Sequence, residues 1–297
     1  VGGEYSGAII YAIEHAGQKR AGLVGGIVVS GCLFGVMLAR LISTILQDPA
    51  LPEYSWRFAF LFGFLLSLIG FFIRSSLTES PEFLKIAQEK KDKSTIPLIE
   101  GMKKYPLEMI AAIMLTGTNG VNFYFVVVFL PEYLKTVNNL ETGYIALLVT
   151  AIPAVLAPVT GCISDKWNRG KMLLLGVFLI GIYSVFALPV VLRFADLTSV
   201  TILISGYAIL FSIQSGTMNT FGVEIFPPKY RFSCGAICYA LGMAVIGGTS
   251  PMIAAILTRN GSDIGYLTIY VVLVTLIGFI FGSMVVFKER LCKITTR

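Results

Sequence analysis

The sequence predicts an all-α integral membrane protein, and three observations lead to that class. Hydrophobic residues make up 56% of the 297 residues and charged residues only 13%, whereas about a quarter of the residues of soluble domains are charged. The mean hydropathy is +0.80. Apolar runs of about 20 residues recur along the chain, and each is long enough to cross a hydrocarbon core of roughly 30 Å as a helix.

The N-terminal part of the chain predicts a partial span followed by two full spans. Residues 1–13 are apolar but too short to cross a bilayer, and a polar turn follows at residues 14–20. The next run, at residues 21–46, is rich in glycine, which allows helices to approach one another closely. A third apolar run covers residues 56–73.

A charged segment then divides the chain into two unequal blocks. Twelve of the 33 residues from Arg74 to Pro106 are charged, a density that the hydrocarbon of a bilayer excludes. The sequence therefore predicts three regions. These are the remainder of an N-terminal helical half at residues 1–73, a cytoplasmic charged loop at residues 74–106 and a C-terminal six-helix half at residues 107–297.

Six further apolar runs predict the six spans of the C-terminal half. Short polar connections separate them, so consecutive helices cross the membrane in alternating directions. The chain as a whole is therefore expected to contain about eight full spans plus a partial first span. The six runs cover residues 107–130, 142–163, 172–192, 199–221, 234–257 and 265–287.

Lys and Arg residues are distributed unequally between the two ends of these spans. One side of the membrane, which we call the basic side, receives 18 of the 23 Lys and Arg residues. The opposite side receives four, and Arg40 lies inside a span, where it can counter an anionic substrate or extend its guanidinium to the interface. Because cytoplasmic loops carry the excess of Lys and Arg, we expect a multi-pass protein of a bacterial inner membrane with a cytoplasmic C-terminus.

Composition also argues against several classes of function. The net charge of +6 arises from short clusters between apolar runs, so no nucleic-acid partner is expected. Five cysteines without a CxxC pair and a single histidine predict no metal site, and no motif predicts a cofactor. No nucleophile and base have a usable spacing, so the sequence does not predict an enzyme.

Three turns at the predicted basic side carry the most informative motifs. Residues 161–171 join two spans closely, and Asp165 and Arg169 can pair there with each other or with helix ends. Taken alone, this turn favours the alternative interpretation, a basic anchor with a turn glycine. Residues 14–22 and 224–235 each place a glutamate at the end of a span, then basic residues, then a glycine. They look like copies of one unit, the alternative being two unrelated anchoring turns.

Together with residues 2–7 and 247–251, these segments resemble the major facilitator superfamily, in particular its metabolite:proton symporter branch, which includes proline/betaine transporters. The pattern departs from the family signature at Asn168, where glycine is usual. The resemblance implies two parallel helical halves that give alternating access to a central site. It also implies proton-coupled symport of a small polar metabolite or osmolyte, either proline/betaine-like or a carboxylate.

Polar residues inside the spans give the candidate site residues. They are costly in lipid unless they face a cavity or a partner, and hydrogen bonding between helices is their alternative role. The candidates for contact with substrate or proton are Glu4, Tyr5, Asn119, Asn122, Tyr124, Gln214 and Asn219. The candidates for gating at the basic side are Glu14, Arg20, Asp165, Arg169, Glu224 and Arg231.

A second function remains open, which is a non-transporting truncated remnant or one chain of a split transporter. If Glu14 and Glu224 are repeat-equivalent, the second copy has about 117 residues before its glutamate and the first has 13. We therefore expect an N-terminally truncated transporter that does not transport alone. The expected partners are a small solute, protons, the lipid bilayer and a separate chain that carries the missing helices.

Overall fold

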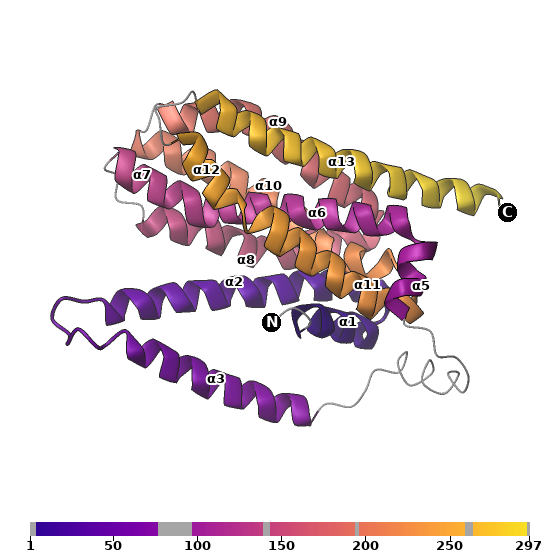
Figure 1. The fold of residues 1–297 in the computed structure, drawn as a ribbon, viewed down its shortest axis with the longest axis horizontal. Helices are drawn as coiled ribbons and strands as arrows, with labels where there is room; N and C mark the ends of the chain where they lie inside the picture. Colours follow the sequence, from indigo (N-terminus) through magenta and orange to yellow (C-terminus); the bar gives the residue numbers. More distant parts are fainter. Residues whose placement is uncertain (1–3, 77–96, 139–142, 194–195, 259–263, 296–297) are drawn as a thin grey trace.

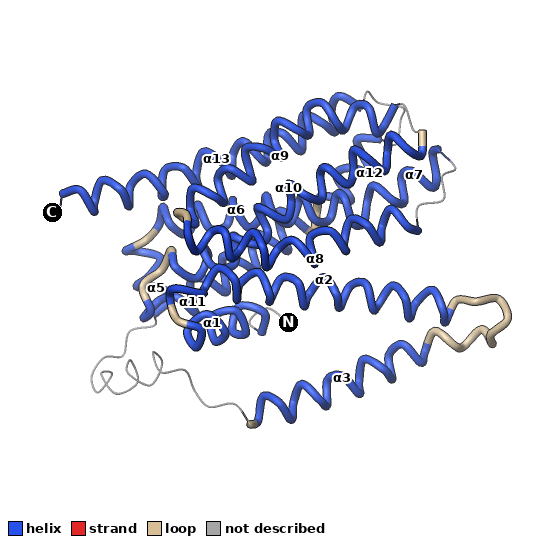
Figure 2. The backbone as a smooth tube through the Cα atoms, turned by 180° about the vertical axis from the view of Figure 1, so that it is seen from behind, coloured by secondary structure: helices blue, strands red, loops and turns tan. Residues whose placement is uncertain are grey.

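The computed structural model describes residues 4–76, 97–138, 143–193, 196–258 and 264–295. Within these residues every regular element is a helix (Figure 2). Eight helices are long and apolar enough to cross a membrane. The predicted all-α membrane fold with about eight full spans is therefore confirmed.

The N-terminal block consists of one short helix and two long ones. A glycine with a positive φ of 72°, Gly17, allows the chain to turn after the first helix. The elements of this block are α1 (Glu4–Ala16), the short η1 (Gln18–Arg20), α2 (Ala21–Leu46) and α3 (Arg57–Ser75).

The C-terminal half contains six spans, two of which include a π-helical segment. The span that begins at Pro106 continues as helix to Asn138, beyond the end expected at residue 130. The elements are α6 (Pro106–Tyr124), η2 (Phe125–Phe129), α7 (Leu130–Asn138), α8 (Gly143–Lys166), α9 (Arg169–Arg193), α10 (Leu197–Glu224), α11 (Pro228–Ala240), η3 (Leu241–Gly247), α12 (Ser250–Thr258) and α13 (Ile264–Thr295).

The helices of the C-terminal half pack into one bundle, with α2 against its side. In the bundle α8 contacts α10, α10 contacts α9, α9 contacts α13, and α13 contacts α6, which packs on η3. The long α2 lies along α8, and α1 lies between α2 and α11 (Figure 1). Helix α3 diverges from the bundle and has no buried residue.

A short helix, α5 (Pro97–Lys104), lies inside the region predicted as a charged loop. It packs on α11 at the basic side. Gly101 is buried there and lies so close to α11 that a Cβ atom at this position would collide with the Sγ atom of Cys234. Residues 97–104 of the charged region are therefore attached to the C-terminal half.

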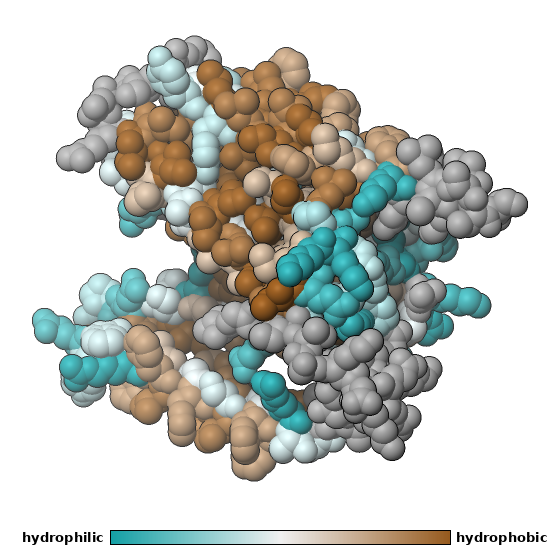
Figure 3. Space-filling view, turned by 45° about the vertical axis from the view of Figure 1, so that its right-hand side comes forward, coloured by the Kyte–Doolittle hydropathy of each residue, from teal (hydrophilic) through white to brown (hydrophobic). Residues whose placement is uncertain are grey.

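Two apolar clusters form the core of the C-terminal half. One lies toward the opposite side and includes Phe125, Leu134 and Ile145, while the other lies toward the basic side and includes Leu115 and Phe226. On the face shown in Figure 3, hydrophobic side chains cover the flank of the bundle and hydrophilic side chains gather toward the helix ends. This distribution fits helices surrounded by lipid, since lipid is as apolar as the core.

Candidate functional site

The N-terminal block meets the C-terminal half along a seam of small residues. A Cβ atom on Gly22 would collide with the carbonyl oxygen of Gly161, and one on Gly26 would collide with that of Ala157. In the same way, Gly25 lies against the side chain of Thr220 on α10. These positions bring the backbones of α2, α8 and α10 into direct contact, as small residues do at membrane helix interfaces.

At the basic end of this seam, Asp165 on α8 caps the first turn of α2. Its Oδ1 accepts a hydrogen bond of 2.7 Å from the amide of Gly22, and its Oδ2 accepts one of 3.0 Å from the amide of Leu23. The N-cap residue of α2, Arg20, provides no side-chain cap. A carboxylate at a helix N-terminus is stabilised by the unpaired amides and the helix dipole, so Asp165 binds the N-terminal block to the C-terminal half.

Arg169 extends this contact to a third helix. Its Nη2 lies 2.7 Å from Asp165 Oδ1, and its Nη1 pairs with Glu224 at the end of α10. The side chains of Asp165 and Arg169 are only 8% and 16% exposed, so the pair is shielded from water. The predicted pairing of Asp165 with Arg169 and with a helix end is present in the structure.

A second ion pair crosses between the blocks beside the first. Arg231 Nη1 on α11 lies 3.1 Å from Glu14 Oε1 on α1, and the two side chains are 14% and 9% exposed. The Nε of Arg231 donates to the carbonyl oxygen of Val223. Five of the six predicted gating residues therefore lie in two ion-pair clusters that join the blocks, while Arg20 is exposed in η1.

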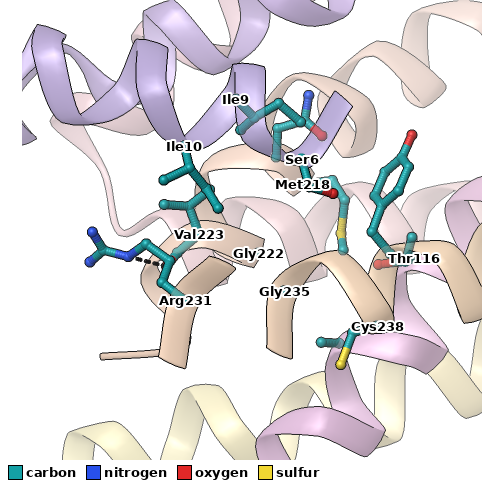
Figure 4. A pocket seen from close by; sticks show the side chains of 13 residues that line it. Ser6, Ile9, Ile10, Thr116, Met218, Gly222, Val223, Arg231, Gly235 and Cys238 are labelled. Carbon is teal, nitrogen blue, oxygen red and sulfur yellow. Dashed lines mark hydrogen bonds between the residues drawn. The ribbon is translucent and has the colours of Figure 1, made fainter. Parts of the chain in front are cut away.

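A cavity of ≈ 40 Å³ lies above these clusters, between α1, α6, α10 and α11 (Figure 4). It is lined by Ser6 and Ile9 of α1, by Met218 and Asn219 of α10 and by Thr116 of α6. The Oγ of Ser6 is buried and has no hydrogen-bond partner among the described residues. The cavity therefore combines hydroxyl and amide groups with one arginine, Arg231, in a mostly apolar lining, and a few convergent polar groups among apolar ones are typical of binding sites.

Two predicted candidates meet at the edge of this cavity. The Nδ2 of Asn219 donates a hydrogen bond of 2.8 Å to the hydroxyl of Tyr5, although the two residues belong to different blocks. The ring of Tyr5 also packs against Tyr239, with ring centroids 4.9 Å apart. These three residues place polar groups from α1, α10 and α11 at one point.

A second polar group is buried within the C-terminal half. The Nδ2 of Asn122 donates to Gln214 Oε1 at 2.9 Å, and the hydroxyl of Tyr207 donates to Asn122 Oδ1 at 2.8 Å. All three side chains are almost completely buried. The Nε2 of Gln214 has no partner among the described residues, which leaves its two N–H donors available to a ligand or a water molecule.

The remaining candidates occupy less defined positions. Asn119 and Tyr124 are half-buried on α6, and the Oδ1 of Asn119 has no partner in the described part of the chain. Glu4 pairs with Arg74 at 3.1 Å, but both side chains are about three-quarters exposed, at 77% and 75%. The structure thus gathers Tyr5 with Asn219 and Asn122 with Gln214, and leaves Glu4 apart from both groups.

Several residues of the site are missing from the sequence-based candidates. Tyr207 lies seven residues before Gln214 on α10, so helical periodicity places both on one face, and this spacing was the available signal. Ser6 and Tyr239 carry no comparable pattern. They belong to the site because α1 and α11 bring them there.

A further cluster holds α5 on α11 outside the membrane-spanning segments. Glu100 accepts hydrogen bonds from Lys104 at 2.8 Å, from Lys229 at 2.6 Å and from Tyr230 at 2.7 Å. The hydrogen bond from Lys104, together with those from Lys229 and Tyr230, lowers the pKa of Glu100 from 4.5 to about 2. Glu100 is therefore ionised throughout the physiological pH range.

Comparison with known proteins agrees with this architecture. A proline/betaine transporter of Escherichia coli K12 is 25% identical over 95% of this chain and 59% of its own length. A Staphylococcus aureus MSSA476 protein named as a proline/betaine transporter is 26% identical over 94% of this chain and 61% of its own length. The chain thus spans about three-fifths of the length of these relatives.

Structural comparison gives the same fold. The proton:xylose symporter XylE, solved with 6-bromo-6-deoxy-D-glucose, superposes with a TM-score of 0.70 at 17% identity, covering 93% of this chain and 65% of XylE. The sequence model of the Major Facilitator Superfamily matches residues 1–231. The match covers most of the chain, including α1, the seam and the network around Asp165, and the chain belongs to the Major Facilitator Superfamily.

Proposed function

We propose that this chain provides the C-terminal half and part of the N-terminal half of a secondary active transporter that carries a small polar metabolite or osmolyte together with protons. The observation that carries the proposal is the position of the cavity between the two blocks. Ser6 of the N-terminal block lines it together with Met218 and Asn219 of the C-terminal half. Arg231, which pairs with Glu14 of the N-terminal block, is among the residues that line it, and an ion pair between two blocks that must separate fits alternating access.

The lining of the cavity, which is uncharged except for Arg231, supports a small polar solute. Hydroxyl and amide groups of Ser6, Thr116 and Asn219 line it, and Arg231 lies at its basic end. The relatives named as proline/betaine transporters support the same class of substrate. Proton coupling is proposed on the resemblance of the sequence motifs, with Glu4 as the candidate carboxylate inside the partial span.

The proposal assigns transport to the chain together with the helices that complete the N-terminal half, whether in one polypeptide or in a separate chain. Helix α3 supports this, because it has no buried residue in the structure although it is long and apolar enough to span. The second candidate, a non-transporting remnant, is supported by the same exposed helix.

Uptake measurements test the proposal and separate the two candidates. Cells producing the 297-residue chain, with or without a co-produced protein carrying the N-terminal helices of a relative, receive labelled proline, betaine, ketoglutarate or citrate. We expect saturable uptake that a protonophore abolishes and that Asn219→Ala weakens, in the combined cells only. Uptake that persists with the protonophore would refute proton coupling, and its absence for every solute in both kinds of cell would favour the remnant.

The orientation in the membrane is part of the proposal and has its own test. The basic side is assigned to the cytoplasm because of the excess of Lys and Arg there, which places α5 inside and α7 outside. Cysteines are introduced at Lys103 on α5 and Lys135 on α7, both of which are exposed. An impermeant maleimide added to intact cells should label position 135 only, and labelling of position 103 alone would reverse the assignment.

A further inference from the structure

Arg40 places a guanidinium inside a membrane-spanning helix, where a charge needs a partner. It lies on α2, six residues before Leu46, which is about 9 Å from the helix end at 1.5 Å per residue. Its Nη2 donates a hydrogen bond of 2.6 Å to the backbone carbonyl oxygen of Val127. Since α2 belongs to the N-terminal block and Val127 lies in η2, this bond crosses between the two blocks.

The sequence explains why this carbonyl accepts a hydrogen bond from another helix. In an α-helix the carbonyl of Val127 would accept from the amide of residue 131. That residue is Pro131, which has no N–H group. The helix is also π-helical at Phe125–Phe129, directly before the proline. An unpaired carbonyl is strongly unfavourable inside a bilayer, and Arg40 provides the missing donor.

This contact has a counterpart at the other end of the same helix. Asp165 binds the amides of Gly22 and Leu23 at the basic side, whereas Arg40 binds Val127 toward the opposite side. Helix α2 is therefore fastened to the C-terminal half at both ends. In a cycle of alternating access, each end of α2 must separate from the C-terminal half when the transporter opens to that side of the membrane.

Arginine suits such a contact because its guanidinium stays charged and presents five donors in a fixed plane. A role as counter-ion to a solute in the cavity is less consistent with the geometry. The cavity is lined by residues of α1, α6, α10 and α11, and Arg40 of α2 does not occur in this lining.

We propose that Arg40 and the carbonyl of Val127, left without its helical donor by Pro131, form a latch that holds the two blocks together toward the opposite side of the membrane. Arg40 is a positioning residue that stabilises the closed arrangement of α2 and η2. The role of the latch in a transport cycle rests on the proposed function. The existence of the latch does not rest on the proposed function, because the latch is detected through the distance between two helices.

Distance measurements in lipid nanodiscs test the latch without requiring transport. Spin labels are attached to cysteines at Ile45 on α2 and Lys135 on α7, both exposed and both beyond the bond, in a chain whose five native cysteines are replaced. The parent should give one main distance. Arg40→Ala should raise the ratio of longer to main distances by about tenfold, within the usual range of conformational couplings, and Arg40→Lys should restore most of the main distance.

A second variant reaches the same bond from its other partner. Pro131→Ala returns an amide donor to the carbonyl of Val127, so this amide competes with Arg40 for the carbonyl and the longer distances should again increase. If the bond is the cause, the double variant Arg40→Ala/Pro131→Ala should exceed neither single variant. Arg57→Ala is the matched control, since this exposed arginine contacts the ring of Trp56, and it should leave the distances unchanged.

Three results would overturn the latch. One is an unchanged distance distribution in Arg40→Ala, and another is additive effects of the two substitutions. The third is an unchanged distance distribution in Pro131→Ala, which replaces the first result if Arg40→Ala does not yield a monodisperse protein. Failure of the parent chain to take up solute leaves all three distance measurements intact, so the latch and the proposed function can fail separately.

Discussion

Helices α2 and α3 are neighbours in sequence and both are apolar enough to cross a membrane, yet they differ completely in burial. Seven residues of α2 are buried and none of α3. The glycines Gly22 and Gly26 of α2 meet the backbone of α8, whereas Gly63 and Gly70 of α3 have nothing within 4 Å. Apolar composition takes a helix into the membrane, but small residues in register with a neighbour decide whether it packs on protein.

The largest effect is expected from a bulky side chain placed in the seam between α2 and α8. Gly26→Val adds a side chain where a Cβ atom already collides with the carbonyl of Ala157. We expect a loss of about 3 kcal/mol in the free energy of unfolding, because neither backbone can withdraw. Unfolding by dodecyl sulfate titration in mixed micelles measures this loss.

Gly63→Val on α3 is the matched control. The space around Gly63 is open, so the change should stay within about 0.5 kcal/mol. Equal losses for the two variants would show that α3 packs on protein as closely as α2 does.

The second prediction concerns the charges at the ends of the two helices. Asp165→Asn removes the charge that caps α2 and pairs with Arg169 at 2.7 Å. A loss of about 2 kcal/mol is expected, since a buried charge-assisted hydrogen bond is weakened. In a complete transporter the same change should lower the transport rate with little effect on solute affinity, because Asp165 lies away from the cavity.

Glu4→Gln serves as its control, because the pair of Glu4 with Arg74 at the end of α3 is largely exposed. Its effect on stability should stay below about 0.5 kcal/mol. If Asp165→Asn instead abolished solute binding while the blocks still separated normally, the assignment of Asp165 to conformational switching would be wrong.

The third prediction compares a buried polar group with one on the surface of α3. Asn122→Ala leaves the hydroxyl of Tyr207 without its acceptor and the side-chain carbonyl oxygen of Gln214 without its donor. Hydrogen bonds between membrane helices average about 0.6 kcal/mol, so a loss of about 1 kcal/mol is expected. Ser67→Ala on α3, which removes a bond to the carbonyl of Gly63 in its own helix, should have no measurable effect in the same titration.

The smallest expected effect concerns α5, whose attachment to α11 depends on Glu100. Because docking lowers the pKa of Glu100 from 4.5 to about 2, the ionised form favours the docked state. Docking should therefore be complete above about pH 4.5 and weaken only as the pH falls toward 2. Hydrogen–deuterium exchange of residues 97–104 should be unchanged between pH 5 and 8 after correction for the intrinsic rate.

Glu100→Gln should increase exchange in this segment at every pH, and Glu53→Gln, an exposed residue before α3, should not. Slow exchange that persists in Glu100→Gln would mean that the packing of Gly101 on Cys234 holds α5 without the carboxylate.

The sequence by itself determined the membrane class, the number of spans and the basic side, because hydropathy and charge act locally along the chain. It could not show that Asp165 caps α2, that Tyr5 meets Asn219, or that α5 docks on α11.

Which helix faces contact one another became evident only from the packed structure. The pairs that define the site join residues 92, 143 and 214 positions apart, and their contact depends on the rotation and tilt of each helix. In lipid every apolar face is equally well solvated, so hydrophobicity does not select among them. The contacts are instead selected by small residues and by polar groups such as Arg40 and Asp165, whose partners become identifiable only once the helices are packed.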